Sequence, residues 1–302
     1  MLGRIKSNQD FRRLIQTVRE RITDAEIGIS SSAIAYYLLL SIFPLIIAIG
    51  NILPFLNIDI ETLLNYIAMI IPADVFKMLE GTIRSLLENS YGSLLSLSAL
   101  ATLWAASRSI NALQRSLNKV YGVGGSRNMI VTRMVSFIVI FLFLFGVVLL
   151  TTLFTVGQSI FDALMPNFPF LKGLAETFSA VRWPAILFGI FATMFVIYYF
   201  LPNAKIHVRY ILPGTFFTTV GWMVLTQVFG YYAKYFAGSF SSYGIIGSFI
   251  IVMLWFNFAA TLIIAGGIVN AVTEEYFCGT IVERNLSLDY IRGKLKEKTE
   301  KN

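Results

Sequence analysis

The chain has 302 residues, of which 56% are apolar and only 14% are charged, and its formal net charge at pH 7 is +7. Because soluble domains carry about 25% charged residues, this composition excludes an ordinary soluble protein and predicts an all-α membrane protein. The single cysteine, Cys278, excludes an internal disulfide framework and a multi-cysteine metal site.

The N-terminal segment, residues 1–29, is predicted to contain a basic amphipathic helix. Its apolar residues recur at helical spacing and arginines occupy much of the remaining surface; the apolar set is Phe11, Leu14, Ile15, Val18 and Ile22. Such a helix either lies on an anionic inner leaflet or packs as a solvated helix on the bundle, and the pattern leaves both interpretations open.

Six uncharged runs are long enough to cross a membrane as helices, which need about 20 mostly apolar residues. Together they form a transmembrane domain over residues 30–273, with spans near residues 30–53, 91–108, 134–160, 183–201, 211–233 and 244–272. If the N-terminus is cytoplasmic, 19 of the 24 Lys and Arg residues fall in cytoplasmic segments. The positive-inside rule therefore predicts that both termini are cytoplasmic. This orientation explains the basic charge, so we expect no nucleic-acid partner.

Amphipathic helices are also predicted outside the spans. Residues 58–90 carry two apolar stripes separated by Pro72, which predicts two short helices against the outer surface. They serve packing, or they cover or gate a cavity. On the inner side, residues 108–121 are predicted to extend the second span as a helix beyond the membrane surface. The charged tail, residues 274–302, is expected to be cytoplasmic and disordered.

Four stretches of the sequence carry a family resemblance. They are AYYLLLSIFPL (35–45), LWAASRSINALQRSLNKVYGV (103–123), YYFLPNAKIHVRYILPGT (198–215) and SYGIIGSFIIVMLWFNFAATLIIAGGIVNAVTEE (242–275). Together they resemble the YihY/BrkB membrane proteins, long carried under the label ribonuclease BN. The resemblance implies a six-helix protein of the bacterial cytoplasmic (inner) membrane. It also implies a role in envelope traits such as serum resistance, or in export of lipid or lipopolysaccharide precursors, whereas the ribonuclease label belongs to an unrelated soluble metallohydrolase.

The inventory of reactive side chains argues against an enzyme. His207 is the only histidine, and no acidic residue between Glu176 and Glu274 is available to orient it in a catalytic triad. We therefore predict no catalytic residue, no metal site and no cofactor. The predicted spans also contain no Asp or Glu, which argues against a carrier that couples transport to a buried carboxylate.

Cationic side chains at the inner rim form the candidate binding site. An extended turn would place Lys205, His207 and Arg209 on one side, at the same membrane level as Arg108. A lipid phosphate is the expected ligand, and the alternative is that these charges only orient the chain. The candidate headgroup contacts are Arg108, Asn111, Arg115, Lys119, Lys205, His207 and Arg209.

A second group of residues is predicted to lie in the bundle interior, where amides form hydrogen bonds between helices. This group is Trp104, Ser107, Asn257 and Asn270. The leading hypothesis is a transporter or flippase for an anionic amphipathic envelope lipid, with membrane lipids as partners. The alternative is a structural or regulatory membrane protein, and an enzyme at the membrane surface comes third. The sequence leaves open whether the chain forms a homo-oligomer.

Overall fold

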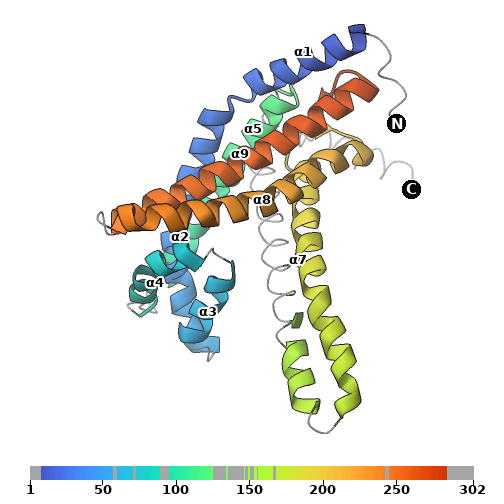
Figure 1. The fold of residues 1–302 in the computed structure, drawn as a ribbon. Helices are drawn as coiled ribbons and strands as arrows, with labels where there is room; N and C mark the ends of the chain where they lie inside the picture. The colour runs from blue at the N-terminus through green and yellow to red at the C-terminus, as the bar shows by residue number, and fades with distance from the viewer. Residues whose placement is uncertain are drawn as a thin grey trace, which may run out of the picture.

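The chain folds into a set of long helices with shorter helices packed at their ends (Figure 1). The computed structural model describes residues 8–56, 60–70, 73–88, 95–124, 153–154, 156–165, 168–241 and 245–283, with isolated positions 134, 146 and 149. The only strands in this part of the chain are the two-residue β1 (Ala204–Lys205) and β2 (Val282–Glu283), which pair antiparallel.

Four helices among the described residues are long and apolar enough to cross a membrane. They are α2 (Ile27–Leu56), α7 (Lys172–Phe200), α8 (Val208–Ser241) and α9 (Ile245–Cys278). They coincide with the predicted first, fourth, fifth and sixth spans, so the chain is a multi-pass membrane protein. The predicted second span falls in α5 (Leu95–Val120), which is too polar to meet the same criterion. Most of the predicted third span lies outside the described residues.

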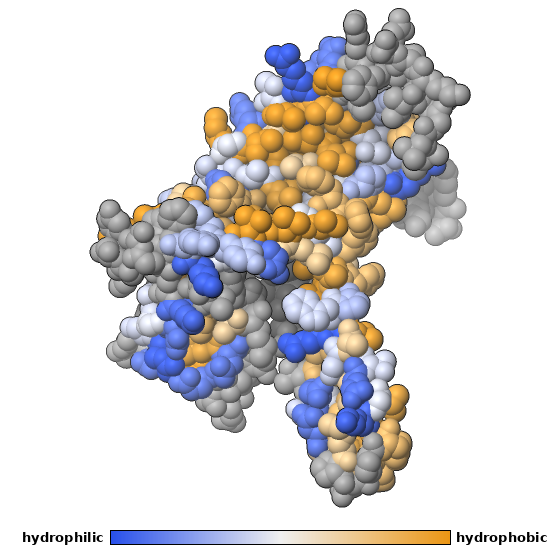
Figure 2. All heavy atoms as spheres, viewed as in Figure 1, coloured by the Kyte–Doolittle hydropathy of each residue, from blue (hydrophilic) through white to orange (hydrophobic). Residues whose placement is uncertain are grey.

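The helices α8 and α9 run side by side, and α2 packs against both α5 and α9. By contrast, α7 contacts α8 at one end and then projects away from the α8–α9 pair (Figure 1). Figure 2 shows apolar side chains in a broad area over α8 and α9, as expected for surface that faces lipid. Exposed apolar residues on these two helices include Phe216, Val224, Ile246 and Phe258.

The predicted outer helices are α3 (Ile60–Ile70) and α4 (Ala73–Glu88). Their apolar stripes face inward and form a core cluster with α8 and α9, made of Leu64, Leu79, Ile83, Leu87, Phe229, Ile251 and Val252. An ion pair between Arg84 and Glu61 joins α3 to α4 on the opposite side. The contacts therefore give these helices a packing role.

The helix α5 continues past the predicted span to Val120, followed by a turn in which Gly122 has a φ of +65°. Glycine adopts this left-handed conformation without steric cost, and it is therefore the common residue just after a helix end. The last turns of α5 enter a second core cluster with α7 and α9 that includes Leu117, Val120, Tyr198, Leu201 and Ile264. This cluster fixes the end of the bundle that carries the candidate site.

Candidate functional site

The candidate site lies where the end of α5, the turn between α7 and α8, and the end of α9 meet. We call this region, made of residues 114–122, 201–209 and 274–283, the polar junction. Side-chain hydrogen bonds hold its parts together. Gln114 donates from Nε2 to the carbonyl oxygen of Leu201 at 2.8 Å, and the backbone N–H of Asn203 donates to Oδ1 of Asn118 at 2.7 Å.

A short β-ladder ties the turn before α8 to the chain that follows α9. Ala204 pairs with Glu283 and Lys205 pairs with Val282. The backbone from Ala204 to His207 is extended enough that Ala204 and Ile206 are buried while Lys205 and His207 are exposed. The predicted alternation is therefore present for Lys205 and His207. Arg209, however, lies in the first turn of α8 and not in the extended segment.

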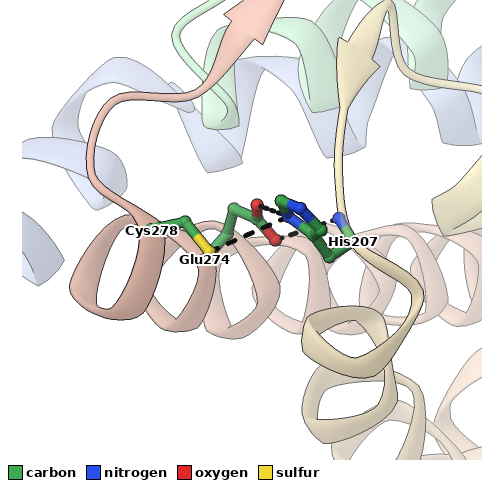
Figure 3. A group of neighbouring side chains, drawn as sticks. All are labelled: His207, Glu274 and Cys278. Carbon is green, nitrogen blue, oxygen red and sulfur yellow. Dashed lines mark hydrogen bonds and ion pairs between the residues drawn. The ribbon is translucent and has the colours of Figure 1, made fainter.

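His207 is held by a carboxylate, which corrects the prediction that none lies beside it (Figure 3). The backbone N–H of His207 donates to Oε2 of Glu274 at 3.1 Å, and its Nδ1 lies 2.7 Å from Oε1. Glu274 is only 3% exposed, whereas the side chain of His207 is 68% exposed. The prediction failed because the partner lies 67 residues further along the chain, on α9, whereas His207 lies in the turn before α8.

The same finding corrects the boundary of the last span. The helix α9 continues beyond residue 272 to Cys278, so Glu274 lies in the last turns of this helix and not in a disordered tail. The apolar candidate span in α9 extends over the same turns, so a carboxylate lies at its end. Glu274 lies near its end, where His207 supplies a partner for the buried charge.

Some cations at this end of the bundle already have partners. Lys119 forms an ion pair with Glu26, and Arg21 of α1 (Asn8–Asp24) lies 2.9 Å from Glu275. The guanidinium carbon of Arg209 lies 4.6 Å from the ring centre of Tyr210, and the guanidinium donates a hydrogen bond to the hydroxyl of the same residue. These contacts fix the orientation of Arg209, which forms no salt bridge with a carboxylate among the described residues.

Arg108 lies apart from the polar junction. It precedes Asn118 by ten residues, which is about 15 Å along a helix axis. The structure therefore does not bring Arg108 together with Lys205 and Arg209 as the sequence predicted. Its guanidinium instead lies 5.3 Å from the ring centre of Trp104. Trp104 is 51% exposed, so its predicted place in the bundle interior is wrong.

Three cations of α5 nevertheless share one exposed face, as their spacing predicts. Arg108, Arg115 and Lys119 are all exposed, and we call them the basic stripe. Asn111 lies between them, half-buried, and its side-chain oxygen has no hydrogen-bond partner among the described residues. Directly after the last residue of α5, burial raises the pKa of the Tyr121 phenol, so this side chain adds no negative charge beside the basic stripe.

The other predicted interior residues lie at helix contacts. Ser107 and Asn270 are buried, and Oδ1 of Asn270 accepts a hydrogen bond from the backbone N–H of Gly214 at 2.7 Å. Asn257 is half-buried and donates to the hydroxyls of Ser31 and Ser32. These bonds join α9 to α8 and to α2, which is the packing role expected of amides in a membrane bundle.

The sequence reading missed Glu274 and Cys278 as partners of His207. Cys278 Sγ lies 3.8 Å from His207 Nδ1. The available signal was their separation of four residues, which places two side chains on one face of a helix. Ending the predicted span at residue 272 obscured this signal, because it separated Glu274 and Cys278 from the helix that carries both.

Comparison with known proteins gives one family and one curated relative. The family model described as "Virulence factor BrkB" matches residues 18–285. A Bacillus subtilis (strain 168) protein named "Putative ribonuclease-like protein YfkH" is 33% identical over 249 residues, covering 81% of this chain and 89% of the relative. No solved structure matches the chain significantly.

Proposed function

The chain belongs to the virulence factor BrkB family, and from this premise we propose that it binds and translocates an anionic amphipathic lipid of the bacterial envelope. The family match confirms the resemblance carried by the four sequence stretches. Membership together with the four long apolar helices makes the chain a multi-pass membrane protein. The lipid, and its movement, are our proposal.

The proposed topology has six spans, both termini in the cytoplasm, and the bacterial cytoplasmic membrane as its location. The four apolar helices supply four spans, and α5 and residues 134–160 would supply the second and third. The distribution of Lys and Arg supports this orientation, because 19 of the 24 fall in the segments that the proposal assigns to the cytoplasm.

One observation carries the lipid proposal. Arg108, Arg115, Lys205 and Arg209 are exposed, and no ion pair among the described residues involves any of them. Cations near a cytoplasmic membrane surface attract anionic lipid by about 1 kcal/mol each. Arginine also binds a phosphate through two parallel hydrogen bonds. The exposed cations thus suit phosphate headgroups of lipids whose acyl chains lie against the apolar surface.

Two other functions compete with this proposal. In a structural or regulatory protein the same cations would serve only to orient the chain. An enzyme at the membrane surface has in its favour the His207–Glu274 pair and the printed name of the Bacillus relative. Lipid binding explains why the cations are exposed, and it requires no catalysed reaction. We therefore propose that the protein is not an enzyme.

Lipid retained by the gently purified protein tests the proposal. We expect mass spectrometry to find one anionic lipid class enriched over the membrane average. Each of the changes Arg108→Gln, Lys205→Gln and Arg209→Gln should lower its retention about fivefold, since about 1 kcal/mol is lost per charge. The matched control is Lys234→Gln, because Lys234 is exposed near the opposite end of α8 from Arg209.

Transport is tested separately in reconstituted vesicles. We expect a fluorescent analogue of the retained lipid to change leaflets faster with the protein than with protein-free vesicles, and the Arg209→Gln variant to slow this exchange. Retention that is equal in all variants would refute the binding site. Retention without any exchange would instead support the structural function.

A further inference from the structure

We propose that His207, Glu274 and Cys278 form a binding site for a transition-metal ion of the zinc class. Their ligand atoms all lie within 4.8 Å of one another, and the three side chains point toward a common centre (Figure 3). The site does not depend on the proposed lipid function. It is the only such group of three among the described residues.

The spacing of the ligand atoms is close to that of a tetrahedral site. With Zn–S near 2.3 Å and Zn–N near 2.05 Å, tetrahedral geometry separates sulfur and nitrogen by about 3.6 Å and nitrogen and oxygen by about 3.4 Å. Sγ of Cys278 lies 3.8 Å from Nδ1 of His207, whereas Nδ1 lies 2.7 Å from Oε1 of Glu274. Metal binding therefore requires the His207–Glu274 hydrogen bond to open by less than 1 Å. It also requires Sγ of Cys278 and the carboxylate oxygen of Glu274, which lie within 4.8 Å of each other, to settle at about 3.6 Å.

The backbone around the three ligands is well fixed. Glu274 and Cys278 lie one turn apart on α9, and the helix ends immediately at Gly279, whose φ is +84°. The chain then returns to form the ladder with β1, which directly precedes His207. Since the backbone N–H of His207 holds Oε2 of Glu274, the other carboxylate oxygen is positioned for a metal.

The chemistry of the three ligands favours zinc. Thiolate and imidazole are good ligands for Zn²⁺, and a carboxylate oxygen completes the three protein ligands that open zinc sites commonly use. His207 and Cys278 are exposed, so a fourth position is accessible to water or an anion. The ion would displace the thiol proton of Cys278 into solvent. It would also replace the hydrogen between Nδ1 of His207 and Oε1 of Glu274, so that the neutral imidazole carries its proton on Nε2. It would also balance the buried charge of Glu274.

The competing interpretation is a simple His207–Glu274 pair beside an unrelated thiol. The two interpretations differ in the role of Cys278, which is the only cysteine of the chain, as His207 is the only histidine. Any thiolate-to-metal absorption must therefore come from Cys278. This makes Co²⁺, which reports its ligands by absorption, a suitable probe for the full-length protein carrying an affinity tag without histidine.

The experiment titrates Co²⁺ into the chelator-treated protein and then displaces it with Zn²⁺. We expect one equivalent of Co²⁺, a thiolate charge-transfer band, and complete displacement by Zn²⁺. Cys278→Ser should abolish the band, and Cys278→Ser and His207→Gln should each weaken binding about 100-fold or more, since even loss of a residue that only orients a ligand costs about 10- to 100-fold.

Asp24→Asn is the control, because it removes an exposed carboxylate at the end of α1 that is not one of the three ligands, and it should leave the band and the affinity unchanged. Cys278 and His207 are exposed, so their replacement leaves the packing intact, which size-exclusion chromatography verifies. The absence of the band in the wild-type protein would overturn the proposal. So would wild-type affinity in either ligand variant.

Discussion

At the scale of single residues, Gly214 of α8 and Gly266 of α9 allow these two helices to approach each other closely. A Cβ atom on Gly266 would lie 1.9 Å from the hydroxyl oxygen of Thr218 and 2.3 Å from that of Tyr198. These two hydroxyls are themselves hydrogen-bonded at 2.6 Å, and Tyr198 also donates to the carbonyl of Ile263. A side chain at Gly266 would therefore disrupt the polar contact among α7, α8 and α9.

We predict that Gly266→Ala destabilises the protein by about 1–3 kcal/mol, the usual cost of overpacking a well-packed site. Gly230→Ala is the matched control, because Gly230 lies in α8 with open space around its Cβ position. It should be neutral or stabilising by up to about 1 kcal/mol, as Ala favours helix over Gly. The measurement is the unfolding temperature in detergent, and equal temperatures for the two variants would contradict the predicted close contact.

The sequence predicted single residues with mixed success, for a physical reason. A buried amide needs a partner in the membrane, so the interior position of Asn270 follows from its chemistry. Its partner, Gly214, is 56 residues away, and this pairing depends on how α8 crosses α9.

The position of Trp104 was predicted wrongly because hydropathy does not show which face of α5 is covered by other helices. The contact between His207 and Glu274 depends on the tertiary packing of α9 against the turn before α8, which no local sequence pattern encodes.

At the scale of elements, α1 is fixed to the bundle by a half-buried ion pair. Both Nε and Nη2 of Arg21 donate to Oε2 of Glu275, and the two side chains are 15% and 23% exposed. A Cβ atom on Gly122 would lie 2.4 Å from Arg21, so the glycine also makes room for this pair. Yet Ile15 and Ile22 remain exposed. One face of α1 therefore packs on the bundle through Val18, whereas the exposed Ile15 and Ile22 are free to contact lipid.

Breaking this ion pair should loosen α1 without unfolding the bundle. We predict that Arg21→Gln weakens the docking of α1 by about 1.5–3 kcal/mol, the usual value of hydrogen bonds to a charged group. Hydrogen exchange of α1 amides should then accelerate about tenfold or more, while exchange in α9 stays unchanged. Arg19→Gln, which alters an exposed neighbour, is the control. Comparable acceleration in both variants would show that the Arg21–Glu275 pair does not hold α1.

The sequence predicted the ends of helices correctly where the periodic pattern of apolar residues begins or stops. The break between α3 and α4 agrees with the two apolar stripes separated by Pro72, and the end of α5 after Val120 agrees with the glycines that follow it. The end of α9 was misplaced because a charged residue was taken to end the span. Glutamate is compatible with a helix, and here its carboxylate also pairs with His207, which is tertiary information that the local sequence lacks.

At the scale of the whole molecule, the proposed topology assigns each segment between two spans to one side of the membrane. The 19 Lys and Arg residues assigned to the cytoplasm include the basic stripe and the polar junction, whereas Lys77 on α4 is assigned outside. The native chain carries its own reporter, because Cys278 is its single cysteine and is exposed. Its position at the end of α9 makes it sensitive to the orientation of the last span.

We predict that a membrane-impermeant maleimide labels Cys278 in inside-out vesicles and not in intact spheroplasts, because α9 is proposed to end in the cytoplasm. A chelator in both samples keeps the thiol free of metal. In a Cys278→Ser background, Lys77→Cys should show the reverse pattern, since Lys77 is exposed on an outer helix. If both sites react from the same side, the two positions are not separated by the membrane and the proposed number of spans between them is wrong. If both patterns are inverted together, the number of spans stands and the orientation fails, and with it the assignment of the exposed cations to the cytoplasmic leaflet.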